Sequence, residues 1–202
     1  MSLIRDLMSK PWETPGYTEP SPADATSPFE DKKVGLWVFL GVVVSVFGLF
    51  TVAYNMRIVL ATDWIVMPKP GILWVNTAVL IMASVAFERA KFSAHNKRVN
   101  GVKYGMLAGG LLTVAFLIGQ WMAWQEMQSA GYFINGNASY AFFYLITGMH
   151  ALHLIGGLYV WARAMTRIFK GYEATLSVEL CTTYWHCLLL IWIVLYGLLL
   201  ST

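Results

Sequence analysis

Few side chains in this sequence could carry chemistry, and most of them lie inside long apolar segments. His150 and His153 are three residues apart in one such segment, and Glu179 and His186 are seven apart in the next. Residues at these spacings lie on one face of a helix. Histidine is a common metal ligand and a proton carrier. The pattern therefore allows a metal or haem site on the three histidines, or a proton-transfer chain that includes Glu179.

A structural role for these residues is the simpler interpretation. A haem held within a helical bundle usually needs a matched pair of ligands across the bundle, and the sequence contains no second pair of histidines at the spacing of His150 and His153. Carboxylates are also scarce in the middle of the apolar segments. A Glu–His pair lowers the energetic penalty of burying either group, and glycines at positions 148, 156 and 157 would let helices approach closely. We therefore expect the histidines to form hydrogen bonds between helices.

The segments that hold these residues are long enough to cross a membrane. Of the 202 residues, 57% are hydrophobic and only 12% are charged, about half the charged fraction of a soluble domain. A membrane-spanning helix needs roughly 20 apolar residues, whereas buried helices of soluble proteins rarely contain more than about 14 in a row. We predict an all-α membrane protein with a five-transmembrane-helix bundle in one domain, residues 34–202, after a polar, proline-rich cytoplasmic arm, residues 1–33. The predicted spans are about 34–54, 72–87, 104–124, 140–161 and 179–200.

The positions of lysine and arginine predict the orientation of the bundle. With the N-terminus inside, twelve of the fourteen basic residues fall in inner segments, and only Arg57 and Lys69 fall outside. Inner loops of membrane proteins carry an excess of Lys and Arg. We therefore expect an inside N-terminus and an outside C-terminus, and we attribute the net charge of +3 to membrane topology and not to nucleic-acid binding. Cys181 and Cys187 fall on different faces of the last span, so no disulfide is expected between them.

Several short motifs occur in a fixed order along the spans. Thr147 to His153 reads TGMHALH, and Glu179 precedes a Tyr-Trp-His run. The other members of the pattern are Asn76 and Thr77 in the second span, Gln120 and Glu126 around the end of the third, and Trp192 and Tyr196 in the fifth. Over roughly residues 34–200 this pattern resembles subunit III of haem–copper terminal oxidases, the cytochrome c oxidase subunit III family. Five spans match the short bacterial form of that family.

The resemblance implies an accessory, non-catalytic subunit of a respiratory oxidase in the bacterial inner membrane. Such a subunit has no redox cofactor of its own, since the haem and copper belong to the partner subunits. It packs against catalytic subunit I in a complex that also contains subunit II, binds phospholipid between its helices, and supports sustained proton-coupled oxygen reduction. The residues to which the resemblance gives a structural, lipid or interface role are Asn76, Gln120, Glu126, His150, His153, Glu179, Tyr184, Trp185 and His186.

Two positions depart from the family pattern and keep alternatives open. The family typically has a buried glutamate in the helix that matches the first span, where residues 42–45 read Val-Val-Val-Ser. It also often has an acidic residue three positions after His186, where this chain has Leu189. The alternatives are a subunit III-like component of a nitric oxide reductase or a member of a larger respiratory supercomplex. A self-sufficient haem or metal membrane protein using His150, His153 and His186 is the alternative from a different class.

Overall fold

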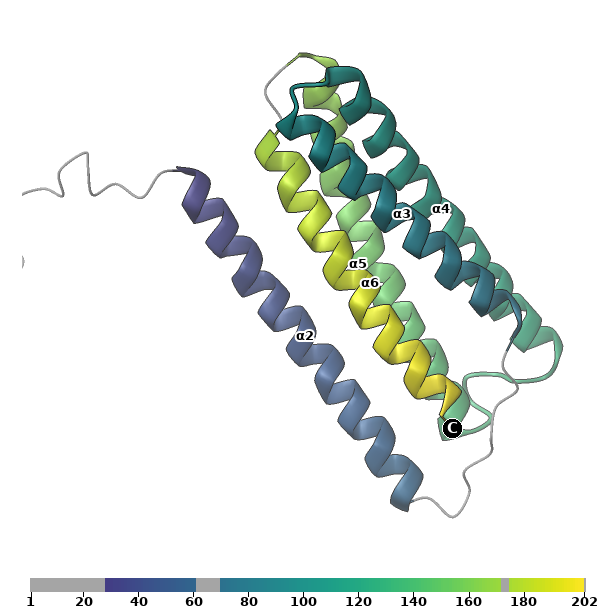
Figure 1. Ribbon diagram of the computed structural model, residues 1–202. Coiled ribbons are helices and arrows are strands. Elements are labelled where there is room, and N and C mark those ends of the chain that lie inside the picture. The colour runs from purple at the N-terminus through teal and green to yellow at the C-terminus, as the bar shows by residue number, and fades with distance from the viewer. Residues whose placement is uncertain (1–27, 61–69, 172–174, 202) are drawn as a thin grey trace, which may run out of the picture. The chain divides into compact units, whose positions relative to one another are not determined.

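The computed structural model describes residues 28–60, 70–171 and 175–201, and within them every regular element is a helix. The chain divides into two units, residues 1–35 and 36–202. The helices, drawn in Figure 1, are α2 (Pro28–Leu60), α3 (Ile72–His95), α4 (Val99–Ser129), α5 (Ala138–Phe169) and α6 (Thr175–Leu200). Among the described residues, all five helices are long and apolar enough to cross a membrane, which confirms the predicted fold class.

Each helix is longer than the apolar segment from which it was predicted. The difference is clearest for α2, which begins at Pro28 and so includes residues that we assigned to the N-terminal arm. Proline is well tolerated in the first turn of a helix, because its missing N–H has no partner there in any case. Hydropathy marks only the part of a helix that crosses the hydrocarbon, and polar residues continue the helix beyond it. The remainder of the predicted arm lies outside the described residues.

The ends of α3, α4 and α5 share one stop signal. The residue after each C-cap lies in the left-handed region of backbone space, at Lys97 (φ 54°), Gly131 (φ 87°) and Gly171 (φ 79°). This conformation lets backbone N–H groups close back onto the last carbonyls of the helix. At the start of α5, the Asn137 side chain accepts a hydrogen bond from the Ser139 N–H at 3.0 Å. These local signals set the helix ends and turn the chain back.

Helices α3 to α6 form a four-helix bundle in which α3 packs on α4, α4 on α5, α5 on α6 and α6 on α3 (Figure 1). Glycines permit the close approach of α3 and α4. A Cβ on Gly105 would lie 2.8 Å from the Ala90 Cβ, and one on Gly109 would lie 2.7 Å from the Phe87 ring. The bundle interior holds large buried aromatic side chains, with Trp185 and Trp192 from α6 among them.

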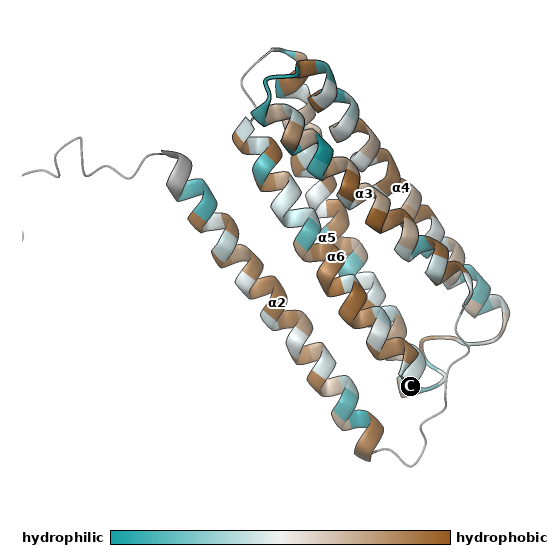
Figure 2. Cartoon of the chain, viewed as in Figure 1, coloured by the Kyte–Doolittle hydropathy of each residue, from teal (hydrophilic) through white to brown (hydrophobic). Residues whose placement is uncertain are grey.

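The part of α2 that belongs to the second unit contacts the bundle through aromatic side chains. Phe47 lies 5.3 Å from the His153 ring and Tyr54 lies 5.5 Å from the Phe142 ring, measured between centroids. Much of the remaining apolar surface of α2 is exposed, as expected for a helix that faces lipid. Figure 2 shows hydrophilic residues gathered where α3 ends and α4 begins, and apolar residues along the middle of the helices.

Candidate functional site

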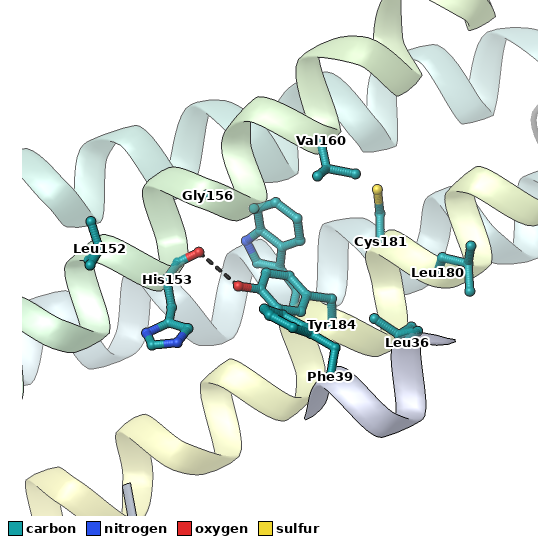
Figure 3. A pocket seen from close by; sticks show the side chains of 11 residues that line it. Leu36, Phe39, Leu152, His153, Gly156, Val160, Leu180, Cys181 and Tyr184 are labelled. Atoms are coloured by element: carbon teal, nitrogen blue, oxygen red, sulfur yellow. Dashed lines mark hydrogen bonds between the residues drawn. The ribbon is translucent and has the colours of Figure 1, made fainter. Parts of the chain in front are cut away.

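An apolar pocket of about 380 Å³ lies between α2, α5 and α6 (Figure 3). Its lining contains no Asp, Glu, Lys or Arg. The lining residues are Leu36, Phe39, Leu152, His153, Gly156, Gly157, Val160, Leu180, Cys181, Tyr184 and Trp185. A pocket of this composition suits an apolar chain and has no charged group with which to bind an ion.

One glycine and one tyrosine shape the wall of this pocket. The Tyr184 hydroxyl donates a 2.8 Å hydrogen bond to the backbone carbonyl of His153, shown as a dashed line in Figure 3. The Tyr184 ring lies against Gly157, where a Cβ would approach within 2.5 Å of it. A Cβ on Gly156 would meet nothing within 4 Å. Of the three glycines that we expected to allow close helix approach, Gly157 does so, Gly156 leaves space in the pocket, and Gly148 makes only ordinary contact with Trp124.

The two histidines of α5 have different environments although they share one helix face. The His153 Nδ1–H donates to the Met149 carbonyl at 2.8 Å, so this ring is held by its own helix. His150 is fully buried, and neither of its ring nitrogens has a hydrogen-bond partner among the described residues. Aromatic rings surround it, with Phe47 at 6.2 Å, Phe116 at 5.9 Å and Trp192 at 5.1 Å between centroids. His150 is thus packed as part of an aromatic core.

The ionisable residues Glu179 and His186 of α6 find their partners on α3. His95 Nε2 lies 3.1 Å from a Glu179 carboxylate oxygen, and His186 Nε2 lies 3.4 Å from a Glu88 oxygen. Ser84 Oγ lies 3.2 Å from the other ring nitrogen of His186. The sequence motifs gave Glu179 and His186 a structural, lipid or interface role, but they did not indicate these partners on α3. A signal was present, because His95 and Glu88 have the same seven-residue spacing as Glu179 and His186.

This arrangement does not assemble the ligand set that the sequence allowed. Within the described ranges, no three His, Cys, Asp or Glu side chains lie together in a way that could hold a metal ion. His186 pairs with α3, while His150 lies among aromatic rings. Both cysteines are free thiols. The residues described here therefore offer no grouped metal ligands.

Three tryptophans connect the helices by one repeated hydrogen-bond arrangement that the sequence motifs did not indicate. In each case the indole N–H donates to a threonine hydroxyl on another helix, and that hydroxyl donates its own proton to the carbonyl four residues earlier in its helix. The pairs and their N···O distances are Trp124–Thr147 (3.0 Å), Trp185–Thr113 (2.8 Å) and Trp192–Thr77 (3.0 Å). Thr77 and Trp185, which belong to the sequence motifs, therefore take part in hydrogen bonds between helices.

The remaining predicted residues divide between the interior and the surface. Gln120 is buried, and neither its amide oxygen nor its nitrogen has a hydrogen-bond partner among the described residues. The Asn76 amide lies against Gly119 of α4, so this buried polar side chain packs where α3 and α4 meet. Glu126 is exposed near the end of α4. The structure thus places Gln120 and Asn76 within the bundle and leaves Glu126 outside it.

Comparison with known proteins identifies the family of this bundle. The family model for cytochrome c oxidase subunit III matches residues 36–200. This chain belongs to the cytochrome c oxidase subunit III family. A "Probable cytochrome c oxidase subunit 3" of Mycobacterium tuberculosis is 29% identical over 156 residues, which cover 74% of this chain and 76% of the relative. A protein of the same printed name from Nocardia farcinica is 28% identical over 158 residues, or 74% and 77% of the two chains.

A longer archaeal relative covers more of this chain. "Heme-copper oxidase subunit I+III" of Aeropyrum pernix is 25% identical over 203 aligned residues, which cover 92% of this chain and 24% of that protein. Family membership confirms the resemblance that the motifs carried. The fold and the family together make this chain a multi-pass membrane protein and a subunit III of the haem–copper oxidase type.

Proposed function

We propose that this subunit III is an accessory, non-catalytic component of a respiratory oxidase that packs on catalytic subunit I, binds phospholipid and supports sustained proton-coupled oxygen reduction. The haem and copper of the reaction would be held by the partner subunits. The observation that carries the proposal is the apolar pocket between α2, α5 and α6, found in a chain of this family. The bacterial relatives support a location in the bacterial inner membrane.

Association with subunit I is supported by the Aeropyrum pernix relative. Its printed name joins subunits I and III, and this chain aligns with about a quarter of its length. Two subunits joined in one polypeptide are made in equal numbers and stay at high effective concentration. We infer that the corresponding surfaces of separate subunits also pack together.

The chemistry of the pocket supports binding of a phospholipid acyl chain. Transfer of an acyl chain from water into an apolar site contributes roughly 0.8 kcal/mol per buried CH₂ group. Gly156 leaves open space in the wall, and Tyr184 has its hydroxyl engaged with the backbone, so the pocket presents an apolar surface. A bound lipid would fill the space between α2 and the bundle.

The contribution to proton-coupled turnover would be indirect. The predicted first span has no carboxylate within residues 34–54, so α2 offers no proton-carrying acid at that depth. Several polar side chains of the bundle form links between helices, such as Trp185 with Thr113. We therefore assign this chain the role of a scaffold that preserves its neighbour during turnover, and not that of a proton relay.

The test compares Gly156→Phe with Gly197→Phe in the purified oxidase. Both glycines have open space around them, but only Gly156 lines the pocket. We expect Gly156→Phe to lower the phospholipid content of the complex and to speed its inactivation during turnover, whereas Gly197→Phe should behave as wild type. Removal of the whole subunit should leave the haem and copper spectrum unchanged. Equal lipid content in both variants, or loss of metal on removal, would contradict the proposal.

A further inference from the structure

A second cavity, of about 530 Å³, lies on the surface formed by α3 and α4, near the end where α3 finishes and α4 starts. Helix α3 contributes Met82, Val85, Arg89 and Ser93 to this α3–α4 groove, and α4 contributes Tyr104 among others. We propose that the α3–α4 groove binds an anionic phospholipid, with the headgroup phosphate at Arg89 and an acyl chain along the apolar end.

The groove exists because small side chains line the crossing of the two helices. Ala86 and Gly105 lie in the groove and are only partly exposed, since Gly105 packs against Ala90 of α3. The larger side chains of Met82 and Tyr104 also line it and are exposed, at 51% and 74%. A hollow with small residues beneath and long residues beside it can accept a flexible chain.

Polarity changes along the length of the groove. Ile81 and Met82 lie at one end, and Arg89 and Ser93 lie at the other. From Ile81 to Arg89 is eight residues along α3, or about 12 Å. Tyrosine is favoured at the level of the lipid headgroups, and Tyr104 lies at the Arg89 end, five residues into α4. This gradient from cation to hydrocarbon matches the gradient within a phospholipid.

The charge at the polar end is available to a ligand. Arg89 is exposed and makes no ion pair with a described residue. Its acidic neighbour Glu88 is engaged elsewhere, with His186 of α6 at 3.4 Å and Lys91 at 3.6 Å. Arg98 is exposed in the short turn between α3 and α4 and adds positive potential at this end of the groove. Basic residues next to a membrane helix attract anionic lipid.

The groove is separate from the pocket between α2, α5 and α6 and differs from it in chemistry. That pocket contains no charged side chain, so it has no means of selecting a headgroup. The α3–α4 groove contains Arg89, so it should discriminate between headgroups by charge. This inference does not depend on the lipid that we propose for the other pocket.

The experiment uses the protein purified from membranes with whatever subunits accompany it, equilibrated with equal amounts of phosphatidylglycerol and phosphatidylcholine. The ratio of the two lipids retained is measured by mass spectrometry. A juxtamembrane arginine contributes about 1 kcal/mol toward anionic lipid, which corresponds to roughly a fivefold preference. We therefore expect Arg89→Gln to lower the retained ratio by up to about fivefold. The matched control, Arg163→Gln, removes an exposed arginine of α5 that lies outside the groove, so it should lose only the general attraction to anionic lipid and lower the ratio less than Arg89→Gln does.

Photo-crosslinking locates the lipid independently of its charge. Phosphatidylglycerol with a photoreactive acyl chain should label α3 and α4 around Met82, and Ala108→Trp, which fills the groove, should abolish that labelling. The matched control is Ala162→Trp on α5. An unchanged lipid ratio in Arg89→Gln would overturn the proposal. A photoreactive amino acid in place of Met82 that crosslinks to a partner protein and not to lipid would also overturn it, because the groove would then hold a protein helix. The Gly156→Phe test measures lipid bound in the pocket between α2, α5 and α6, so either proposal can fail while the other holds.

Discussion

The hydrogen bond between Trp185 and Thr113 allows a quantitative test of how the bundle is held together. The indole N–H of Trp185 on α6 donates to the Thr113 hydroxyl of α4 at 2.8 Å. Trp185 is 1% exposed and Thr113 is fully buried, so neither water nor lipid headgroups can replace a lost partner. Thr113→Val keeps the shape of the side chain and removes the only oxygen that it offers. The substitution therefore removes the bond from Trp185 and the bond to the Gly109 carbonyl with little change in packing.

Two ranges of hydrogen-bond energy set the loss of stability expected for Thr113→Val. A buried donor left without a partner costs about 1–3 kcal/mol, while side-chain hydrogen bonds between membrane helices average about 0.6 kcal/mol and reach about 1.7. The short distance and complete burial of this bond favour the upper part of the second range. We expect Thr113→Val to lower the free energy of unfolding by about 1–2 kcal/mol.

The assay is equilibrium unfolding of the full chain in mixed micelles, arranged as a double-mutant cycle with Trp185→Phe. The cycle removes the contributions of cavity and shape that each single variant adds, and leaves the pairwise energy. We expect a coupling of about 1 kcal/mol. Thr166→Val is the control, because Thr166 is exposed and its hydroxyl bonds only within α5. A coupling near zero, or a Thr113→Val variant as stable as wild type, would refute the reasoning.

Three further outcomes test the fold and the site. Gly157→Ala should destabilise the chain by about 1–3 kcal/mol, because the new Cβ would meet the Tyr184 ring. Gly156→Ala should be close to neutral, and unfolding curves of the two variants measured side by side test the difference. Glu179→Gln should lower stability by less than about 1 kcal/mol, because its partner His95 is half exposed and exposed ion pairs contribute little; a drop of several kcal/mol would mean that the pair is buried in its native setting. Metal analysis of the isolated chain should find no stoichiometric iron or copper, and a bound metal lost with a single histidine substitution would revive the metal alternative.

The sequence predicted the elements of this bundle well and their contacts poorly. Long apolar segments have few alternatives to a membrane helix, so five spans could be read from hydropathy. The partners of Glu179 and His186 could not be predicted, because spacing shows which residues share a face of a helix but not which neighbouring helix that face meets. The hydrogen bonds from Trp185 and Trp192 to their threonines were missed for a related reason. A threonine within an apolar segment does not stand out in the sequence, and its role here depends on an indole that is distant along the chain.

The links made by α6 have a consequence for the time course of assembly. A chain emerges from its N-terminal side first, so α6 is synthesised after α3, α4 and α5. Until α6 is made, the Thr77 and Thr113 hydroxyls have no indole N–H from which to accept a hydrogen bond. His95 likewise lacks the Glu179 carboxylate. The hairpin of α3 and α4 must wait in the membrane held chiefly by its close glycine contacts. The last of the described helices to be made therefore supplies these bonds to the bundle, and a chain interrupted before α6 would present quality-control proteases with helices that lack them.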